Sequence, residues 1–192
     1  MDEKELIKKA KSGDFDSFNE LIKVHIDKIY RLALKITKNH EDAEDIVQNT
    51  FYKAIDKLDQ FREESSFSTW VYKIALNETR SHISGEAKFI VKPIEEYLPG
   101  AHESESSKLY DWRDPDANFE SSQTQKLLDD SLADMTDKYS VPFILKYIEE
   151  MPVKQVAEIL GLTEAAAKSR ILRARLALRD ILSQHIEGTK IV

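Results

Sequence analysis

MPVKQVAEILGLTEAAAKSRILRARLALRDIL, which runs from Met151 to Leu182, is patterned as two helices joined by a tight turn. A proline is tolerated in the first turn of a helix, so Pro152 fits the start of the first one. Gly161 ends that helix, and Thr163 is a good N-cap for a second helix beginning at Glu164. The gap of about three residues is typical of a helix-turn-helix. The apolar positions of the first helix follow helical spacing: Val153, Val156, Ala157 and Leu160.

The second of these helices has a narrow apolar stripe and a basic opposite face. Between Thr163 and Arg179 it carries five basic residues and one acidic residue, a local charge of +4 in a chain whose net charge is −7. Small side chains let such a helix enter a groove, and Lys or Arg on its rims can neutralise phosphates. The pattern therefore favours binding to duplex DNA. A solvated amphipathic helix with no ligand is the alternative that charge alone leaves open.

The composition excludes several classes of protein. The 192 residues include 33% charged and 41% hydrophobic side chains with only five glycines and five prolines, which favours helix over sheet. With no cysteine, disulfides and thiolate chemistry are excluded, and the five histidines are scattered without ligand spacing. No catalytic motif is present, so we expect no enzyme, no cofactor and no metal site. Neither a membrane span nor an export signal is seen, which predicts a cytoplasmic protein.

Helical periods fill the first part of the chain. They predict a short helix over Lys4–Lys11, a second from about Ser17 to Thr37 capped by Asp14 or Asp16, and a third, strongly patterned one from Ala43 to Leu58. The third helix has a polar face, and the acidic residues of this face lie near the positive end of the helix dipole. Stabilisation by the dipole alone could explain why acidic residues occur there. That face comprises Asp42, Asp45, Gln48, Asn49 and Lys53.

A polar loop with two phenylalanines, DQFREESSFST, follows Leu58 and precedes a fourth helix, for which Ser68 is a candidate N-cap. Aromatic residues in such a loop are either core anchors or platforms for stacked bases, and anchors are the commoner case. Trp70 is expected to belong mainly to the core.

The rest of the sequence completes an all-α fold of two small helical domains joined by a flexible acidic linker. Helical periodicity fails from Glu86 to Glu120, where nine acidic residues oppose four basic ones. It returns from Ser121 onward, with a helix expected to be capped by Ser140 before the helix-turn-helix. The predicted domains are residues 1–88 and 121–192, with the linker at 89–120.

Four motifs in this order resemble those of bacterial extracytoplasmic-function (ECF) sigma factors, small subunits of RNA polymerase. They are DAEDIVQNTF at 42–51, FSTWVYKIALN at 67–77, VAEILGLT at 156–163 and KSRILRAR at 168–175. The resemblance covers about residues 18–83 and 127–182. It implies that the N-terminal domain is sigma region 2, that the C-terminal domain is sigma region 4, and that the partners are core RNA polymerase and promoter DNA.

The resemblance also assigns roles to residues of the first domain. The polar face of the third helix would dock on core polymerase, through Asp42, Asp45, Gln48 and Asn49. The Phe61–Thr69 loop and the helix after it would open the promoter minus-ten element and capture a flipped base, which costs a few kcal/mol and so needs a pocket in return. The implied contacts are Arg62, Ser65, Ser66, Phe67, Ser68 and Asn77.

In the second domain the resemblance places the basic helix in the major groove of the minus-thirty-five element. Lys168, Ser169, Leu172 and Arg173 would face the bases, while Arg170 and Arg175 would contact phosphates. The acidic linker would thread toward the polymerase active centre, where it could occupy a channel built for nucleic acid.

Two other hypotheses about the function of the chain remain open. A non-sigma helix-turn-helix regulator would explain the second domain but not DAEDIVQNTF or FSTWVYKIALN. A polymerase-binding decoy that does not initiate transcription would explain every motif. An anti-sigma factor is a further candidate partner, since one is common in the family, but no residue here identifies it.

Overall fold

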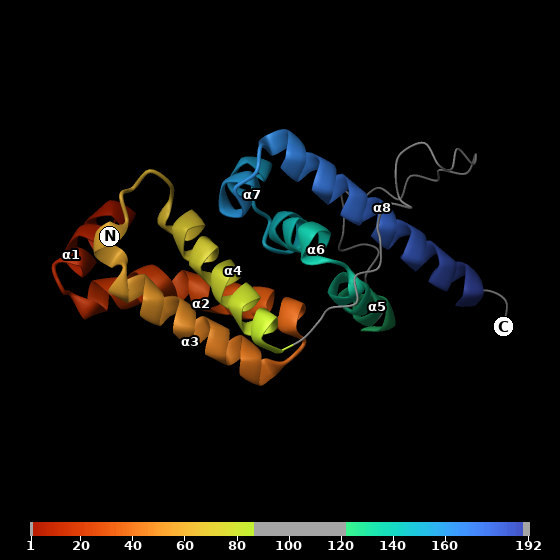
Figure 1. Cartoon of the computed structure of the whole chain (residues 1–192), viewed down its shortest axis with the longest axis horizontal. Helices are drawn as coiled ribbons and strands as arrows, with labels where there is room; N and C mark the ends of the chain where they lie inside the picture. The colour runs from red at the N-terminus through yellow and green to blue at the C-terminus, as the bar shows by residue number, and fades with distance from the viewer. Residues whose placement is uncertain (1, 87–121, 190–192) are drawn as a thin grey trace.

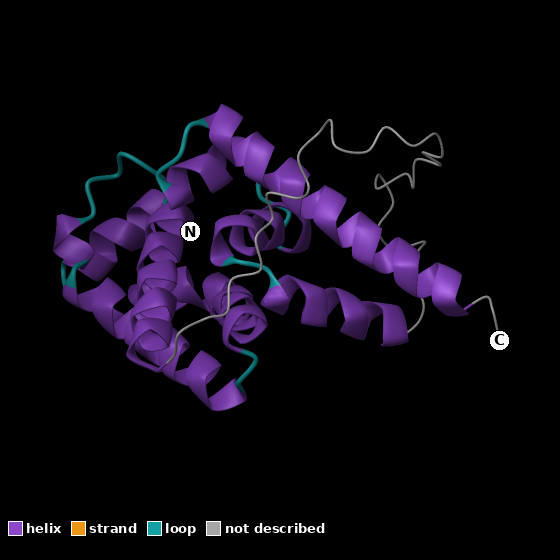
Figure 2. Cartoon of the chain, turned by 45° about the vertical axis from the view of Figure 1, so that its right-hand side comes forward, coloured by secondary structure: helices purple, strands orange, loops and turns teal. Residues whose placement is uncertain are grey.

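The computed structural model describes residues 2–86 and 122–189 of the chain, and over these ranges it contains helices and loops without strands (Figure 2). The all-α prediction is therefore confirmed. The N-terminal helices α1–α4 form one group, and α5–α8 form a second group beside it (Figure 1). The predicted linker, 89–120, lies outside the described residues.

The N-terminal group begins with α1 (Glu3–Lys11) and the long α2 (Phe15–Thr37). Asp14 is the N-cap of α2, and its carboxylate accepts a hydrogen bond from the amide of Asp16 at 3.1 Å. Of the two caps that the sequence offered, Asp14 is thus the one used. α3 (His40–Asp56) follows a second cap, Asn39, whose side-chain oxygen accepts from the Glu41 amide at 2.9 Å. A short 3₁₀ turn, η1 (Leu58–Gln60), and a loop lead to α4 (Phe67–Glu86).

The C-terminal group comprises α5 (Ser122–Asp134), α6 (Asp137–Phe143), α7 (Val153–Leu160) and α8 (Glu164–Thr189). A π-helical turn, η4 (Ile144–Ile148), continues α6. The predicted cap at Ser140 is wrong, because the helix has already begun at Asp137 and Ser140 is buried inside it, with its hydroxyl donating to the Thr136 carbonyl at 3.3 Å. Pro142 also lies within α6. A proline beyond the first turn has no amide hydrogen, so it removes one of the backbone hydrogen bonds of the helix.

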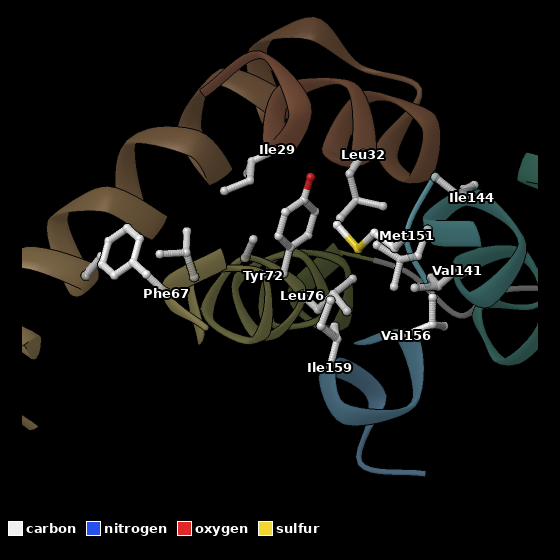
Figure 3. Close-up of a cluster of buried hydrophobic side chains, with 14 of the residues drawn as sticks. Ile29, Leu32, Phe67, Tyr72, Leu76, Val141, Ile144, Met151, Val156 and Ile159 are labelled. Atoms are coloured by element: carbon white, nitrogen blue, oxygen red, sulfur yellow. The ribbon is translucent and has the colours of Figure 1, made fainter. Parts of the chain in front are cut away.

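The hydrophobic core is continuous between the two groups. α4 packs against α7, and α2 packs against α5. Figure 3 shows Leu32, Tyr72 and Leu76 of the N-terminal group meeting Met151 and Ile159 of the C-terminal group. All of these side chains are at most 6% exposed, so the two predicted domains bury apolar surface against each other as well as within themselves.

Candidate DNA and polymerase interfaces

The helix-turn-helix forms as the sequence predicts. α7 ends at Leu160, and Gly161 adopts the left-handed conformation, with φ +66°. α8 begins three residues later at Glu164, and the Thr163 hydroxyl accepts a hydrogen bond from the Ala166 amide at 3.2 Å. A satisfied amide at this position fixes the first turn of α8, which is the part of a recognition helix that reaches the bases. Pro152 is the residue before α7 rather than its first helical residue.

The predicted base-facing side of α8 is accessible. Lys168, Ser169 and Leu172 are exposed, and Leu172 is 41% exposed although it is apolar. The opposite side of the helix buries a stripe against the rest of the domain: Ala167, Ile171, Ala174, Leu178 and Leu182. Arg170, Arg173 and Arg175 are half-buried at the edges of the exposed side. The structure thus brings together all six residues that the sequence assigned to the minus-thirty-five element.

Tyr139, at the start of α6, is a neighbour of Arg173 that no motif in the sequence predicts. Burial by itself would raise the pKa of Tyr139, but the polar contacts and positive charges of Arg173 and Lys138 lower it below the usual value. Tyr139 is therefore a candidate for positioning the Arg173 guanidinium.

The polar face of α3 is the candidate polymerase surface. Asp45, Gln48 and Asn49 are exposed, whereas Asp42 is only 22% exposed and lies beside His82 of α4, with 3.0 Å between Asp42 Oδ1 and His82 Nε2. α4 also supplies Glu78, whose carboxylate pairs with Lys53 of α3 at 2.7 Å. The Lys53–Glu78 ion pair and the packing of α3 against α4 hold α3 in place, so its exposed acidic and amide groups are presented on a packed helix.

The candidate minus-ten loop is anchored by aromatic side chains. Phe67 is 0% exposed, and its ring stands edge-on to Phe61, with 5.8 Å between the centroids. Trp70 packs against both rings, at 5.2 Å from Phe61 and 5.8 Å from Phe67. The Phe67 ring is thus enclosed by the core in this arrangement and supports the loop from beneath, and its base contact stays a prediction. Trp70 lies mainly in the core, as the sequence suggested.

The polar residues assigned to the minus-ten element, in this loop and in α4, are more exposed than Phe67. Arg62, Ser66 and Asn77 are exposed, and Ser65 is partly exposed. The predicted N-cap at Ser68 is wrong, since α4 begins at Phe67 and the cap is Ser66, whose hydroxyl accepts from the Thr69 amide at 3.1 Å. The stretch S-S-F-S-T, residues 65–69, contains three serines, and each of them is a candidate N-cap. Which serine caps the helix depends on the path of the backbone.

Ser68 contacts the other half of the molecule. The amide nitrogen of Gln155, in α7, donates to the Ser68 hydroxyl at 3.4 Å. The first helix of the helix-turn-helix thus touches the edge of the candidate minus-ten loop. No periodicity or motif in the sequence predicts this contact, because it joins residues 87 positions apart.

Comparison with known proteins assigns both halves to one family. The model for sigma-70 region 2 matches residues 21–89, and that for sigma-70 region 4 matches residues 125–178. The ECF RNA polymerase sigma factor SigW of Bacillus subtilis is 32% identical over 179 residues, which cover 93% of this chain and 96% of SigW. The chain belongs to the ECF sigma factor family. A sigma-E factor of Haemophilus influenzae is 27% identical, covering 88% of this chain and 89% of the relative.

Solved structures of similar fold support the helical architecture of this sigma factor. CnrH, solved in complex with the cytosolic domain of CnrY, superposes with a TM-score of 0.67 at 23% identity, covering 93% of this chain and 96% of CnrH. The sigma factor RpoE, solved with the anti-sigma factor NepR from Bartonella quintana, gives a TM-score of 0.60 at 23% identity, covering 86% of this chain and 96% of RpoE.

Two further findings concern the described part of this sigma factor. None of the helices within 2–86 and 122–189 is long and apolar enough to cross a bilayer. Within the same ranges, no group of three or more His, Asp or Glu side chains is gathered in a way that could hold a metal ion.

Proposed function

We propose that this ECF sigma factor binds core RNA polymerase, directs it to promoters with defined minus-thirty-five and minus-ten elements, and so starts transcription of a set of genes. The observation that carries the proposal is the match to sigma regions 2 and 4 in the family's order, on a chain that is 32% identical to SigW over 93% of its length. The domain boundaries that we propose are 1–88 for region 2, 89–120 for the linker and 121–192 for region 4.

Each surface has a separate task in this proposal. The α3 face, with Asp42, Asp45, Gln48 and Asn49, docks on core polymerase. The loop residues Arg62, Ser65 and Ser66, with Ser68 and Asn77 of α4, contact the minus-ten element, while Phe67 and Trp70 keep the loop in shape from below. The support for this division is the exposure of the polar side chains and the burial of Phe67.

Recognition of the minus-thirty-five element is assigned to α8. Lys168, Ser169, Leu172 and Arg173 are placed to face base edges, and an Arg on a guanine is the commonest specific contact in a major groove. Arg170 and Arg175 are assigned to phosphates, which set the position and carry the salt dependence of binding. The five basic residues between Thr163 and Arg179 support this assignment in a chain of net charge −7.

The sigma factor acts, in this proposal, as an initiation factor with no chemical step of its own, in the cytoplasm where its polymerase works. An anti-sigma factor is proposed as a second protein partner. The solved complexes of CnrH with CnrY and of RpoE with NepR support that part of the proposal, although the likeness at 23% identity concerns the fold.

The test is to add the purified protein to core RNA polymerase and fragmented genomic DNA of its host, and to sequence the transcript 5′ ends that appear. Discrete new starts preceded by two shared short elements are expected, and the shared elements give both recognition sequences. Binding to core polymerase without new starts would indicate a decoy. Binding to duplex DNA alone as a symmetric dimer would indicate a regulator of another class.

A further inference from the structure

Lys11, in the last turn of α1, reaches across to the start of the candidate minus-ten loop. Its Nζ donates a hydrogen bond to the backbone carbonyl of Phe61 at 2.6 Å and lies 5.9 Å from the centroid of the Phe61 ring, within the range of a cation–π contact. α1 packs against η1, the short turn that ends one residue before Phe61, at the same end of the N-terminal group (Figure 1). One ammonium group thus contacts both the carbonyl and the ring of the residue that precedes Arg62.

Phe61 is the residue through which this end of the loop is held. It is 4% exposed, and its ring packs against the rings of Phe67 and Trp70. Its amide donates to the Leu58 carbonyl at 3.1 Å, which ties it to η1. With the hydrogen bond from Lys11, the amide, the carbonyl and the ring of Phe61 all have partners. The direction in which the chain leaves Phe61 is therefore fixed.

The loop beyond Phe61 has little internal support. Within the described part of the chain, residues 62–65 make no backbone–backbone hydrogen bond. Glu63 has the left-handed conformation, with φ 58°, which residues with a side chain seldom adopt and which persists where the surroundings impose it. At the far end of the loop, the Ser66 hydroxyl caps α4. The path of the loop thus depends on how its two ends are held, and Lys11 holds one of them.

The place of Lys11 in its own helix does not explain this contact. Lys8, Lys9 and Lys11 all lie in the last turn of α1, where a cation interacts favourably with the helix dipole. That interaction needs no tertiary partner, and Lys8 is exposed, whereas Lys11 is half-buried and directed at Phe61. The match to sigma-70 region 2 begins at residue 21, so α1 lies outside the segment to which the comparisons give a role.

We propose that Lys11 is a positioning residue for recognition of the minus-ten element. Its ammonium group holds the Phe61 end of the loop, and in this way it sets the path on which Arg62 and Ser65 are presented to the single strand. Lys11 itself does not contact DNA. The effect on recognition rests on the proposed function, whereas the anchoring of the loop does not.

The anchoring is tested on the full chain without DNA. The sequence has two tryptophans, so Trp112→Phe leaves Trp70, which packs against Phe61, as the single fluorophore. In this background, Lys11→Met should increase the quenching of Trp70 by acrylamide, because the ring cluster loses its tie to α1. Lys11→Arg keeps a donor for the carbonyl and should restore the quenching of the parent. Lys8→Met is the matched control, since it makes the same change at an exposed position in the same turn.

The recognition role is tested on the holoenzyme assembled with core RNA polymerase. The probes are a single-stranded oligonucleotide with the minus-ten sequence found by transcript mapping and a scrambled one. Lys11→Met should weaken binding of the matched strand by about threefold to tenfold, the equilibrium effect of about one hydrogen bond, and should leave the scrambled strand almost unchanged. The dependence of binding on salt should stay the same, because no phosphate contact is lost. Lys11→Arg and Lys8→Met should keep the preference of the parent.

Each other outcome contradicts a stated part of the proposal. Unchanged Trp70 quenching in Lys11→Met, with circular dichroism showing a folded protein, would overturn the anchor. Equal losses on both strands, with a salt slope smaller by about 0.7, would show that Lys11 binds a phosphate directly. Greater quenching with an unchanged preference would overturn the role in recognition. Failure of the parent holoenzyme to prefer the matched strand would overturn the proposed function, while the Trp70 measurement would still decide the anchor.

Discussion

His82 Nε2 lies 3.0 Å from Asp42 Oδ1, so the first acidic residue of the α3 polar face is held against α4 while its neighbours on that face point freely outward. Asp42 and Asp45 thus have the same proposed partner and different local roles. An exposed carboxylate contributes little to folding, whereas a half-buried one paired with a histidine contributes up to about 1 kcal/mol.

This difference predicts distinct outcomes for two alanine variants. Asp45→Ala should weaken binding to core RNA polymerase and leave the free energy of unfolding within about 0.5 kcal/mol of the parent. Asp42→Ala should weaken the same binding and also lower the stability, because it removes a half-buried carboxylate that lies 3.0 Å from His82. Titration with labelled core polymerase and urea unfolding measure the two effects, and full polymerase affinity in both variants would remove α3 from the docking surface.

The recognition helix gives a prediction about specificity. Arg173→Ala should weaken binding to the correct minus-thirty-five duplex by about 1–3 kcal/mol and relax the sequence preference, because a base-reading guanidinium is lost. Arg175→Ala should weaken binding to all sequences alike and reduce the salt slope by about 1. Gel-shift titrations on matched and scrambled duplexes check this. Equal losses on both DNAs for Arg173→Ala would contradict the base-reading role.

A substitution at Tyr139 tests whether this residue positions Arg173 for base recognition. Tyr139→Phe removes the hydroxyl whose pKa the nearby Arg173 helps to lower, and it keeps the ring, which is 7% exposed in the core. If the hydroxyl positions Arg173, the variant should lose part of the preference for matched over scrambled DNA, and Arg173→Ala should cost less in this background than in the parent. Additive losses in this double-mutant cycle would show that the two residues act independently.

Local features of the fold could be predicted because they depend on residues that are close together in the sequence. Gly161 and Thr163 mark the turn and the cap of the helix-turn-helix, and both have the conformation or hydrogen bond that their types favour. The predicted helix starts were wrong where several residues could act as the N-cap. Ser66 rather than Ser68 caps α4, and α6 begins before Ser140, because the choice depends on how each helix packs.

Contacts between distant segments could not be predicted. Phe67 was assigned to DNA on the basis of resemblance, but its ring is enclosed by Phe61 and Trp70, which only the folded loop brings together. Glu149 has no sequence pattern around it, and its partners Arg31 and Tyr72 lie 118 and 77 residues away. Periodicity reports which side of a helix is buried and says nothing about which other helix covers it.

His25 predicts how stability depends on pH. It is buried beside Phe67, with ring centroids 5.9 Å apart, and its Nδ1 has no hydrogen-bond partner. Burial, aided by the nearby Lys28, lowers the pKa of His25 to about 4. An unfolded histidine has a pKa near 6.5, so between these values the unfolded state binds the extra proton. The stability should therefore fall as the pH decreases from about 6.5 to about 4, by at most about 3 kcal/mol from this residue.

The contribution of His25 is separated from that of the carboxylates by substitution. His25→Gln is neutral at every pH, so its free energy of unfolding should decline less steeply than that of the parent over the same interval. Urea unfolding at steps of pH measures the two slopes, and an NMR titration of the imidazole gives the pKa directly. A titration midpoint near 6.5 in the folded protein would contradict the prediction.

Thr163 links the stability of α8 to its function. Its hydroxyl accepts the amide of Ala166, which otherwise has no partner in the first turn of the helix. Thr163→Ala should therefore cost about 1 kcal/mol of stability, whereas Thr163→Ser keeps the hydroxyl and should cost little. Because the next turn of the helix carries Lys168 and Ser169, which we propose face DNA, the alanine variant should also bind the minus-thirty-five duplex more weakly, even at temperatures where it is fully folded. Circular dichroism and duplex titrations on both variants measure the two effects, and equal DNA affinity for Thr163→Ala and Thr163→Ser would mean that the cap stabilises the helix without shaping its DNA-binding end.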